Sequence, residues 1–416
     1  MQAQVRTSVA LAIASMAAIG LMAATGAQAQ TKAEVMHWWT SGGESAAVQE
    51  LAAAFNKSGG QWVDTAVAGG EAARAAAINR IVGGNPPTAA MFNTSQQYLD
   101  IIKEGMLNDI DAVAAKEHWD TMLPAPVISS IKVNGHYYAA PVNIHMPSWF
   151  WYSKPAFAKA GITSEPKTPD ELFAALDKLK AAGLVPLALG GQGWQEYITF
   201  YSWVAQVGGT DMYLKFFKDH DAAVVNTPAF RKVLTDFKRL KSYTDAGSPG
   251  RNWNDATSML ITGKAGVQIM GDWAKGEFNN AKQVAGKDFG CFPGFGPKSP
   301  YIIAGDVFVF PRTKDANAIK AQQMLATSIT SAATQVAFNN KKGSIPIRTD
   351  VDASQMDVCA QTGLTIMKDK TRQIGVPDML LAPDVGGAVQ DIISKYWNTP
   401  QSVDDVVKAL QGAIKG

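Results

Sequence analysis

The sequence has little net charge, few cysteines and, after its first residues, no long apolar run. Its 416 residues carry 38 basic and 36 acidic side chains, so the charge balance favours neither a nucleic acid nor an acidic membrane surface as a partner. No later stretch reaches the about 18 uninterrupted apolar residues that a membrane-spanning helix requires. The two cysteines form no Cys-x-x-Cys motif, which leaves zinc binding and dithiol redox chemistry without support.

Recognisable catalytic motifs are also missing. The chain contains no His-Glu-x-x-His motif, no nucleophile elbow and no glycine-rich phosphate loop. Its five histidines show no metal-ligand spacing, and each fits a polar loop or core position better: His37, His118, His136, His145 and His220. We therefore expect no metal and no cofactor, and the case for an enzyme is weak.

The N-terminal segment has the pattern of a signal peptide. Arg6 precedes an apolar run from Val9 to Met22, and Ala27-Gln28-Ala29 supplies a small-residue cleavage site. We therefore expect residues 1–29 to be removed on export, and the absence of a cysteine near this site excludes a lipoprotein. The whole sequence is 47% hydrophobic and 18% charged, a composition that is typical of a globular protein.

Two cysteines in an exported chain leave two alternatives. Cys291 and Cys359 could form a disulfide, which would close a long loop and stabilise the protein by about 2–4 kcal/mol. The alternative is a pair of buried free thiols.

Strand and helix patterns alternate in the first part of the mature chain. We expect strands at 34–39, 61–67 and 89–93, with helices at 45–56 and 71–82 between them. This order indicates an α/β lobe with a largely parallel sheet, in which ligands bind beyond the carboxyl ends of the strands. Trp39–Glu44 and Phe92–Gln96 both follow strands, so both are expected at that edge.

The pattern restarts after Pro141 and predicts a second lobe. An Asn-Gly hairpin at 132–138 precedes the restart, and Thr168-Pro169-Asp170-Glu171 is a strong helix start. A later strand at 307–310 could rejoin the first lobe. We expect two lobes with a cleft between them: lobe 1 from 30–140 plus 304–355, and lobe 2 from 141–303 plus 356–416.

The segment His37–Glu44 has the composition of a sugar site. Two indoles offer flat faces to the C–H side of a sugar ring, while hydroxyls and the Glu44 carboxylate can hydrogen-bond to its OH groups. The plainer interpretation is that both indoles are core. Because neighbouring strand residues point to opposite faces, one of Trp38 and Trp39 can be core while the other lines a cleft.

These segments carry a resemblance to a known family. The sequence resembles the periplasmic glucose/mannose-binding proteins of bacterial ABC importers, which belong to the extracellular solute-binding proteins. The matching pieces lie in order along the mature chain: His37–Glu44, Gly84–Pro87, Pro141–His145, Gly190–Gln195, Gly263–Gly266, Met270–Lys275, Lys342–Arg348 and Cys359–Thr362. The resemblance implies a type II periplasmic-binding-protein fold with two hinged α/β lobes. It also implies a monomer in the periplasm that delivers a small carbohydrate to ABC permease subunits.

The resemblance also implies a set of ligand-binding residues. The main candidates are Trp38, Trp39, Glu44, Asn93, Trp253, Trp273, Asp306 and Lys342, and the weaker ones are Met91, Asn143, His145, Met146 and Leu381. The indoles would stack on the sugar, Glu44 and Asp306 would accept from its hydroxyls, and Lys342 would donate. Taken alone, Lys342 would instead be a surface charge and Trp253 a helix-packing residue.

Four positions depart from the family pattern. Met91, Asn93, Met146 and Leu381 stand where relatives carry other polar or cationic groups. Each buried sugar hydroxyl left without its partner costs about 1–3 kcal/mol, which is about tenfold to a hundredfold in affinity. We therefore expect a ligand other than free glucose: a glycoside, a disaccharide or a less hydroxylated sugar.

Two other functions stay open at this point. Glu44 and Asp306 could be the paired carboxylates of a secreted glycosidase. The protein could also act as an adaptor that presents its closed lobes to a chemoreceptor, which does not exclude transport.

Overall fold

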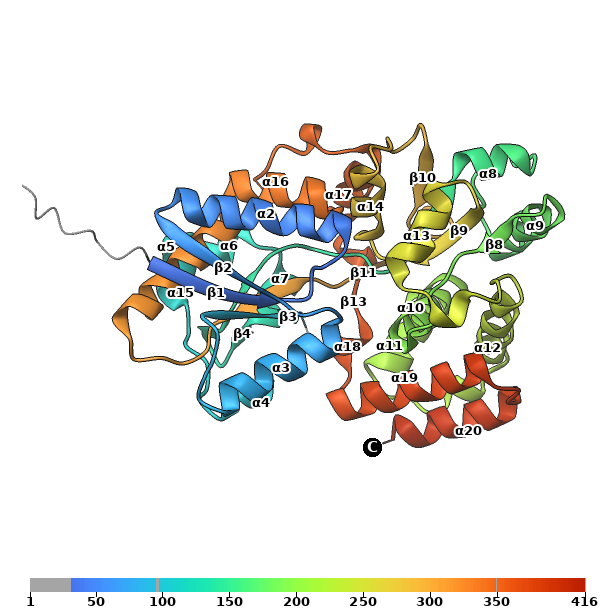
Figure 1. The fold of residues 1–416 in the computed structure, drawn as a ribbon. Coiled ribbons are helices and arrows are strands. Elements are labelled where there is room, and N and C mark those ends of the chain that lie inside the picture. Colours follow the sequence, from blue (N-terminus) through green and yellow to red (C-terminus); the bar gives the residue numbers. More distant parts are fainter. Residues whose placement is uncertain (1–30, 95–96, 349, 416) are drawn as a thin grey trace, which may run out of the picture.

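The computed structural model describes residues 31–94, 97–348 and 350–415 as two α/β lobes joined by several chain crossings (Figure 1). The predicted signal peptide lies outside these residues. Within the same ranges no helix is both long enough and apolar enough to cross a membrane.

The first lobe is built on a five-stranded sheet in the order β2-β1-β3-β12-β6. Strand β1 (Thr31–His37) pairs in parallel with β2 (Gly60–Ala66) and β3 (Ala89–Asn93). Strand β12 (Asp306–Val309) runs antiparallel between β3 and β6 (Ala139–Pro141). The expected return of a late strand to the first lobe is therefore confirmed. The predicted parallel pairing holds for β1, β2 and β3, whereas β12 is antiparallel to both of its neighbours, so the sheet is mixed.

Helices cover this sheet because each buries an apolar face. In α2 (Gly42–Lys57) the buried side chains include Ala47, Val48 and Leu51, which share one helical face. The other elements of this lobe are α3 (Gly70–Val82), α4 (Leu99–Lys103), α5 (Asp111–Lys116), α6 (Trp119–Met122), α7 (Ala125–Ile131), β4 (Lys132–Val133), β5 (His136–Tyr137), α15 (Ala316–Thr330) and α16 (Ala332–Lys342). The Asn-Gly hairpin is confirmed: Asn134 and Gly135 have φ of 51° and 89°, as a two-residue hairpin turn requires.

The second lobe is built on a four-stranded sheet in the order β10-β7-β9-β8. Strand β7 (Trp149–Ser153) runs antiparallel to β10 (Phe289–Phe292) and β9 (Ala265–Met270), and β8 (Val185–Leu187) is parallel to β9. All six residues of β9 are buried, and its one polar side chain, Gln268, is satisfied by accepting from Thr257 at 2.9 Å and donating to the carbonyl of Trp253 at 3.1 Å.

Helices surround this second sheet, and α19 and α20 at the C-terminal end of the chain lie beside α12 (Figure 1). Thr168 caps α9 as predicted, because its Oγ1 accepts the N–H of Glu171 at 3.1 Å. The helices are α8 (Lys154–Lys159), α9 (Pro169–Ala181), α10 (Gly193–Trp203), the π-helical turn η1 (Val204–Gly208), α11 (Gly209–Phe217), η2 (Val224–Asn226), α12 (Pro228–Lys241), η3 (Ser248–Gly250), α13 (Trp253–Ile261), α14 (Ala274–Asn280), α19 (Pro383–Asn398) and α20 (Val403–Ala413).

Short elements connect the lobes. Strands β11 (Tyr301–Ile303) and β13 (Gln373–Gly375) pair in parallel, and the nearby helices are η4 (Ala353–Gln355), α17 (Val358–Met367), η5 (Lys370–Arg372) and α18 (Pro377–Leu380). The strands of the first sheet fall within 31–141 and 306–309, and those of the second within 149–292. The predicted lobe boundaries are compatible with this arrangement and stay a prediction.

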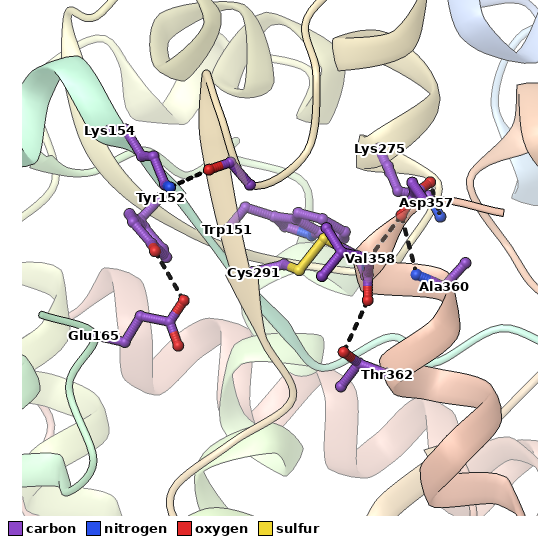
Figure 2. The surroundings of a disulfide bond; sticks show 12 residues. Trp151, Tyr152, Lys154, Glu165, Lys275, Cys291, Asp357, Val358, Ala360 and Thr362 are labelled. Atoms are coloured by element: carbon purple, nitrogen blue, oxygen red, sulfur yellow. Dashed lines mark hydrogen bonds and ion pairs between the residues drawn. A yellow bond between two sulfur atoms is a disulfide. The ribbon is translucent and has the colours of Figure 1, made fainter. Parts of the chain in front are cut away.

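A disulfide fastens α17 to β10. Cys291 and Cys359 are bonded, with their Cα atoms 6.1 Å apart, so the disulfide alternative is the one the structure contains (Figure 2). Beside it, Asp357 accepts the backbone N–H of Ala360 at 3.0 Å and forms a 2.8 Å ion pair with Lys275 (Figure 2). Burial opposes ionisation of Asp357, but Lys275 outweighs it and lowers the pKa of the carboxyl group. The start of α17 is thus held by a covalent bond and a charged contact.

Candidate functional site

A cavity of about 570 Å³ lies where the first sheet faces the second lobe. Residues that follow β1, β2 and β3 line it, so it lies at the carboxyl ends of the parallel strands, as expected. The opposite wall comes from the starts of α10 and α13, the segment after β9, and the chain from Val376 to Gln390. Groups from both halves of the fold therefore converge on one space.

Most of the predicted ligand-binding residues line this cavity. They are Trp38, Glu44, Asn93, Trp253, Trp273, Asp306 and Lys342, joined by the weaker candidates His145 and Leu381. Trp39, Met91, Asn143 and Met146 do not line it. The structure thus brings together residues that are up to 343 positions apart in the sequence, from Trp38 to Leu381.

Trp39 is a core residue, contrary to the expectation that it binds the ligand. Its side chain is 1% exposed and packs against Phe308 and Phe338, with ring centroids 5.8 and 5.2 Å away. Trp38 lines the cavity, so the two neighbouring indoles point to opposite sides of the chain, one into the cavity and one into the core. The ammonium of Lys342 lies 5.7 Å above the Trp39 ring, which therefore supports a cavity residue from behind.

Met91 and Met146 are also core residues. Their exposed fractions are 2% and 0%, and Met91 pairs with Phe308 in the centre of the first sheet. The expectation that these two residues bind the ligand is wrong, because neither lines the cavity. Of the four departures from the family pattern, only Asn93 and Leu381 line the cavity and bear on the choice of ligand.

Asp306 is the centre of a network of hydrogen bonds. The amide groups of Asn93 and Asn143 donate to its carboxylate at 3.1 and 3.0 Å, and the Nε2 atom of His145 lies 3.0 Å from it. Asn143 also accepts the backbone N–H of Asp306 at 2.8 Å. Asn143 is therefore a positioning residue behind Asp306 and not a lining residue.

His145 lies between two carboxylates. Its Nε2 faces Asp306 and its Nδ1 contacts Asp272, which follows β9 of the second sheet. Burial opposes protonation of the imidazole, but the two carboxylates outweigh it and raise the pKa of His145 to about 9 from its ordinary 6.5. Burial likewise works against ionisation of Asp306, yet His145, Lys342 and Asn143 together hold the pKa of this carboxyl below its ordinary value. At neutral pH the site therefore presents an ionised Asp306 supported by an imidazolium.

Glu44 forms the second charged group of the site. Its carboxylate accepts from the ammonium of Lys342 at 2.7 Å, and both side chains are nearly buried. Glu44 is placed by the start of α2, where Ser41 caps the helix and Glu44 completes the capping box. The positive end of the helix favours a carboxylate at this point.

The start of α2 touches the second lobe directly. The backbone N–H of Gly43 donates to Glu277 of α14 at 2.9 Å. A Cβ at Gly43 would come within 2.5 Å of the backbone of Gly276, so only glycine fits this contact. The Gly pair before Glu44 therefore allows close helix packing beside the cavity.

Sequence reasoning missed several lining residues. Arg74 of α3 donates to Asn93 at 3.1 Å, and its guanidinium lies 5.5 Å from the centre of the Trp38 ring. The wall opposite holds Trp194, Tyr197 and Asp378. Arg74 lies one helical turn after the loop that follows β2. The rule that ligands bind beyond the carboxyl ends of parallel strands, which pointed to Glu44 after β1, could therefore have pointed to Arg74 as well.

Within the described parts of the chain, no group of three or more acidic, histidine or cysteine side chains is arranged to hold a metal ion. The chemistry of this site is that of hydrogen bonding, charge and aromatic contact.

The fold and the cavity define a two-lobe receptor for a small solute, with side chains that can bind the solute on both walls of the cavity. The sequence model described as bacterial extracellular solute-binding protein matches residues 39–335, and the chain belongs to this family.

Individual relatives support this assignment. A Mesorhizobium japonicum protein named "Probable sugar-binding periplasmic protein" is 41% identical over 394 residues, which cover 91% of this chain and 93% of the relative. The solved structure of the solute receptor AcbH, described as having an exclusive substrate preference for β-D-galactopyranose, has a TM-score of 0.78 at 21% identity, covering 93% of this chain and 99% of its own. Maltose-bound MalE3 of T. maritima has a TM-score of 0.77 at 18% identity, with 92% and 99% covered. At such identities these two structures show the fold alone.

Proposed function

We propose that the protein is a periplasmic receptor that captures a sugar in this cavity and delivers it to an ABC transporter. The observation that carries the proposal is the joint lining of the cavity by indoles and by ionised hydrogen-bonding groups. Trp38 and Trp273 can stack on the C–H faces of a ring, as aromatic side chains do in sugar sites. Glu44 and Asp306 accept from hydroxyls and Lys342 donates, each contact being worth about 1.5–3 kcal/mol.

The ligand would act by favouring closure of the two lobes. Glu44, Asp306 and Lys342 belong to the first wall of the cavity, and Trp253 and Trp273 to the second. A sugar that needs both walls binds the closed form best, so its binding raises the closed population. The closed monomer then docks on the permease, and a chemoreceptor is a second partner that could recognise the same closed form.

The proposal assigns Glu44 and Asp306 to binding the sugar and not to its hydrolysis. A glycosidase needs one carboxylic acid that can give up a proton, with its pKa raised. The pKa of Asp306 is held low by His145, Lys342 and Asn143, and Glu44 accepts a hydrogen bond from the Lys342 ammonium. Both carboxylates are therefore placed as acceptors, which suits binding without turnover.

The ligand within this proposal is not plain glucose. Leu381 offers an aliphatic surface where the resembling glucose/mannose-binding proteins offer a histidine, and Asn93 is committed to Arg74 and Asp306. One sugar hydroxyl without a partner costs about 1–3 kcal/mol. A ligand that presents fewer hydroxyls to Leu381 and Asn93, or that extends beyond these two residues, avoids the cost of an unpartnered hydroxyl.

A thermal-shift screen of the purified mature protein tests the proposal. The probes are glucose, mannose, galactose, common disaccharides and aryl glycosides, with calorimetry on every hit. A ligand at 1,000 times its Kd stabilises the protein by about 4 kcal/mol, which raises Tm by several degrees. Chromatography of the incubated sugars should show no product. Failure of every sugar to shift Tm would contradict the proposed function, and a largest shift with glucose would contradict only the choice of ligand.

A further inference from the structure

The cavity contains a second set of polar groups that belongs to neither the Glu44–Lys342 pair nor the Asp306–His145 pair. It consists of Arg74, Asp378 and Tyr197, with Trp194 and Tyr201 beside them on the cavity wall. Arg74 links this set to the first one, because it donates to Asn93, which donates to Asp306. The second set therefore adjoins the first along the cavity.

Asp378 lines the cavity and, in the described parts of the chain, makes no hydrogen bond through its carboxyl group. Burial raises the pKa of this carboxyl, and the charge of Arg74 opposes the rise. The charges of the two side chains attract each other. Asp378 is half-buried at the cavity wall, and a carboxylate in such a place normally has hydrogen-bond donors, so a bound solute can supply one here.

Tyr197 provides a second unsatisfied group. Its side chain is 4% exposed and lines the cavity, and its hydroxyl has no hydrogen-bond partner among the described residues. Burial first, and then the nearby Asp378, raise its pKa well above the ordinary value, so the hydroxyl keeps its proton. Trp194 completes this region with an indole whose centre lies 6.3 Å from that of Trp273. The indole walls of the two regions are therefore neighbours.

The charges of this region favour a neutral polar occupant. Arg74 and Asp378 have opposite charges and face the same space, so a fixed charge of either sign would be attracted by one and opposed by the other. Hydroxyl groups accept from a guanidinium and donate to a carboxylate, so they satisfy both. The volume of about 570 Å³ for the whole cavity lies inside the range of about 300–1,000 Å³ of sites that enclose drug-sized ligands.

We propose that Arg74, Asp378, Tyr197 and Trp194 form a subsite for a second sugar ring, so that the ligand is a disaccharide or a glycoside of similar length. This inference rests on the proposed function, in which the first ring lies between Glu44 and Asp306. In the second subsite Asp378 accepts from hydroxyls of the second ring, Arg74 donates to it, Trp194 contacts its C–H face, and Tyr197 forms part of the wall behind them.

Calorimetry with matched mono- and disaccharides tests the subsite. The probes are glucose and galactose against maltose, cellobiose and lactose, each titrated into the full mature protein. At least one disaccharide should bind about tenfold or more tightly than either monosaccharide, because it gains charged hydrogen bonds. Monosaccharides that bind as tightly as every disaccharide would overturn the subsite and leave the proposed function intact. Absence of binding by all five probes would overturn both.

Variants separate the two regions of the cavity. D378N should weaken the tightest disaccharide about tenfold or more while changing monosaccharide affinity less than about twofold. R74Q should weaken the disaccharide clearly more than the monosaccharide, although it affects both, because Arg74 also donates to Asn93 and lies beside Trp38. D384N is the matched control, since Asp384 is exposed on the same segment and does not line the cavity. Melting curves first establish that each variant is folded, and R74Q gives an independent answer if D378N is not. Equal losses for both sugar sizes in a folded variant would refute the inference.

Discussion

The imidazolium of His145 should make the stability of this protein fall at alkaline pH. The folded state raises the pKa of His145 to about 9, against 6.5 for the ordinary side chain. At about 1.4 kcal/mol for each pH unit, this difference corresponds to about 3 kcal/mol of stability. Because the folded pKa is the higher one, the contribution is complete below pH 6.5, declines between 6.5 and about 9, and is absent above that range.

The measurement is the free energy of unfolding in urea, followed by tryptophan fluorescence, for the wild type and for H145Q between about pH 6 and pH 10. The difference between the two proteins cancels the other titrating groups and should shrink by about 3 kcal/mol across this range. H136Q is the matched control: His136 pairs with Asp111 at 2.6 Å but is exposed, so water screens the pair and the loss should be small.

A difference between wild type and H145Q that does not change with pH would refute the reasoning. It would mean that His145 is not protonated more readily in the folded protein. If H145Q fails to fold, an NMR titration of the wild-type imidazole gives the same answer directly. A pKa near 9 supports the account, and a value at or below 6.5 contradicts it.

Three further outcomes are expected. W39A should lower the free energy of unfolding by about 3–5 kcal/mol, as for other buried Trp residues, whereas W38A should mainly weaken sugar binding in calorimetry. K342M should reduce sugar affinity about tenfold to a hundredfold, while K341M, which alters the exposed lysine beside Lys342, should leave it unchanged; equal effects would contradict the role of Lys342. Replacing Cys291 and Cys359 together by serine should cost about 2–4 kcal/mol in urea unfolding, and an unchanged midpoint would show that α17 is held without the bond.

Much of the fold could be predicted because local patterns and final packing agree. The strand at 89–93 was predicted with the bounds that the structure has, since its first four residues are a buried run that follows the turn residues Asn85-Pro86-Pro87. Helix α2 begins at Gly42, three residues earlier than predicted, because Ser41 serves as its cap. Such a shift at a helix end depends on one side-chain hydrogen bond, which the spacing of apolar residues along the sequence does not reveal.

The site was only partly predictable, for reasons of distance along the chain. Alternation in a strand indicates that Trp38 and Trp39 differ in environment, but only their contacts with a distant strand and helix decide which of them is core. Arg74 looks like an ordinary surface residue of a helix until Asn93 and Asp378 are brought near it. Met91 was misplaced because the resemblance supplied a position but not the direction of the side chain.

The position of β12 has a consequence for how the polypeptide folds. This strand lies between β3 and β6, so the sheet of the first lobe stays open until residues 306–309 have been synthesised. The first lobe therefore cannot complete its folding ahead of the rest of the chain, as sequential domains do during synthesis. A fragment that ends before residue 306 would leave the edges of β3 and β6 unpaired, and exposed strand edges of this kind promote aggregation. The two lobes are separate in space but interdependent in the order in which they form.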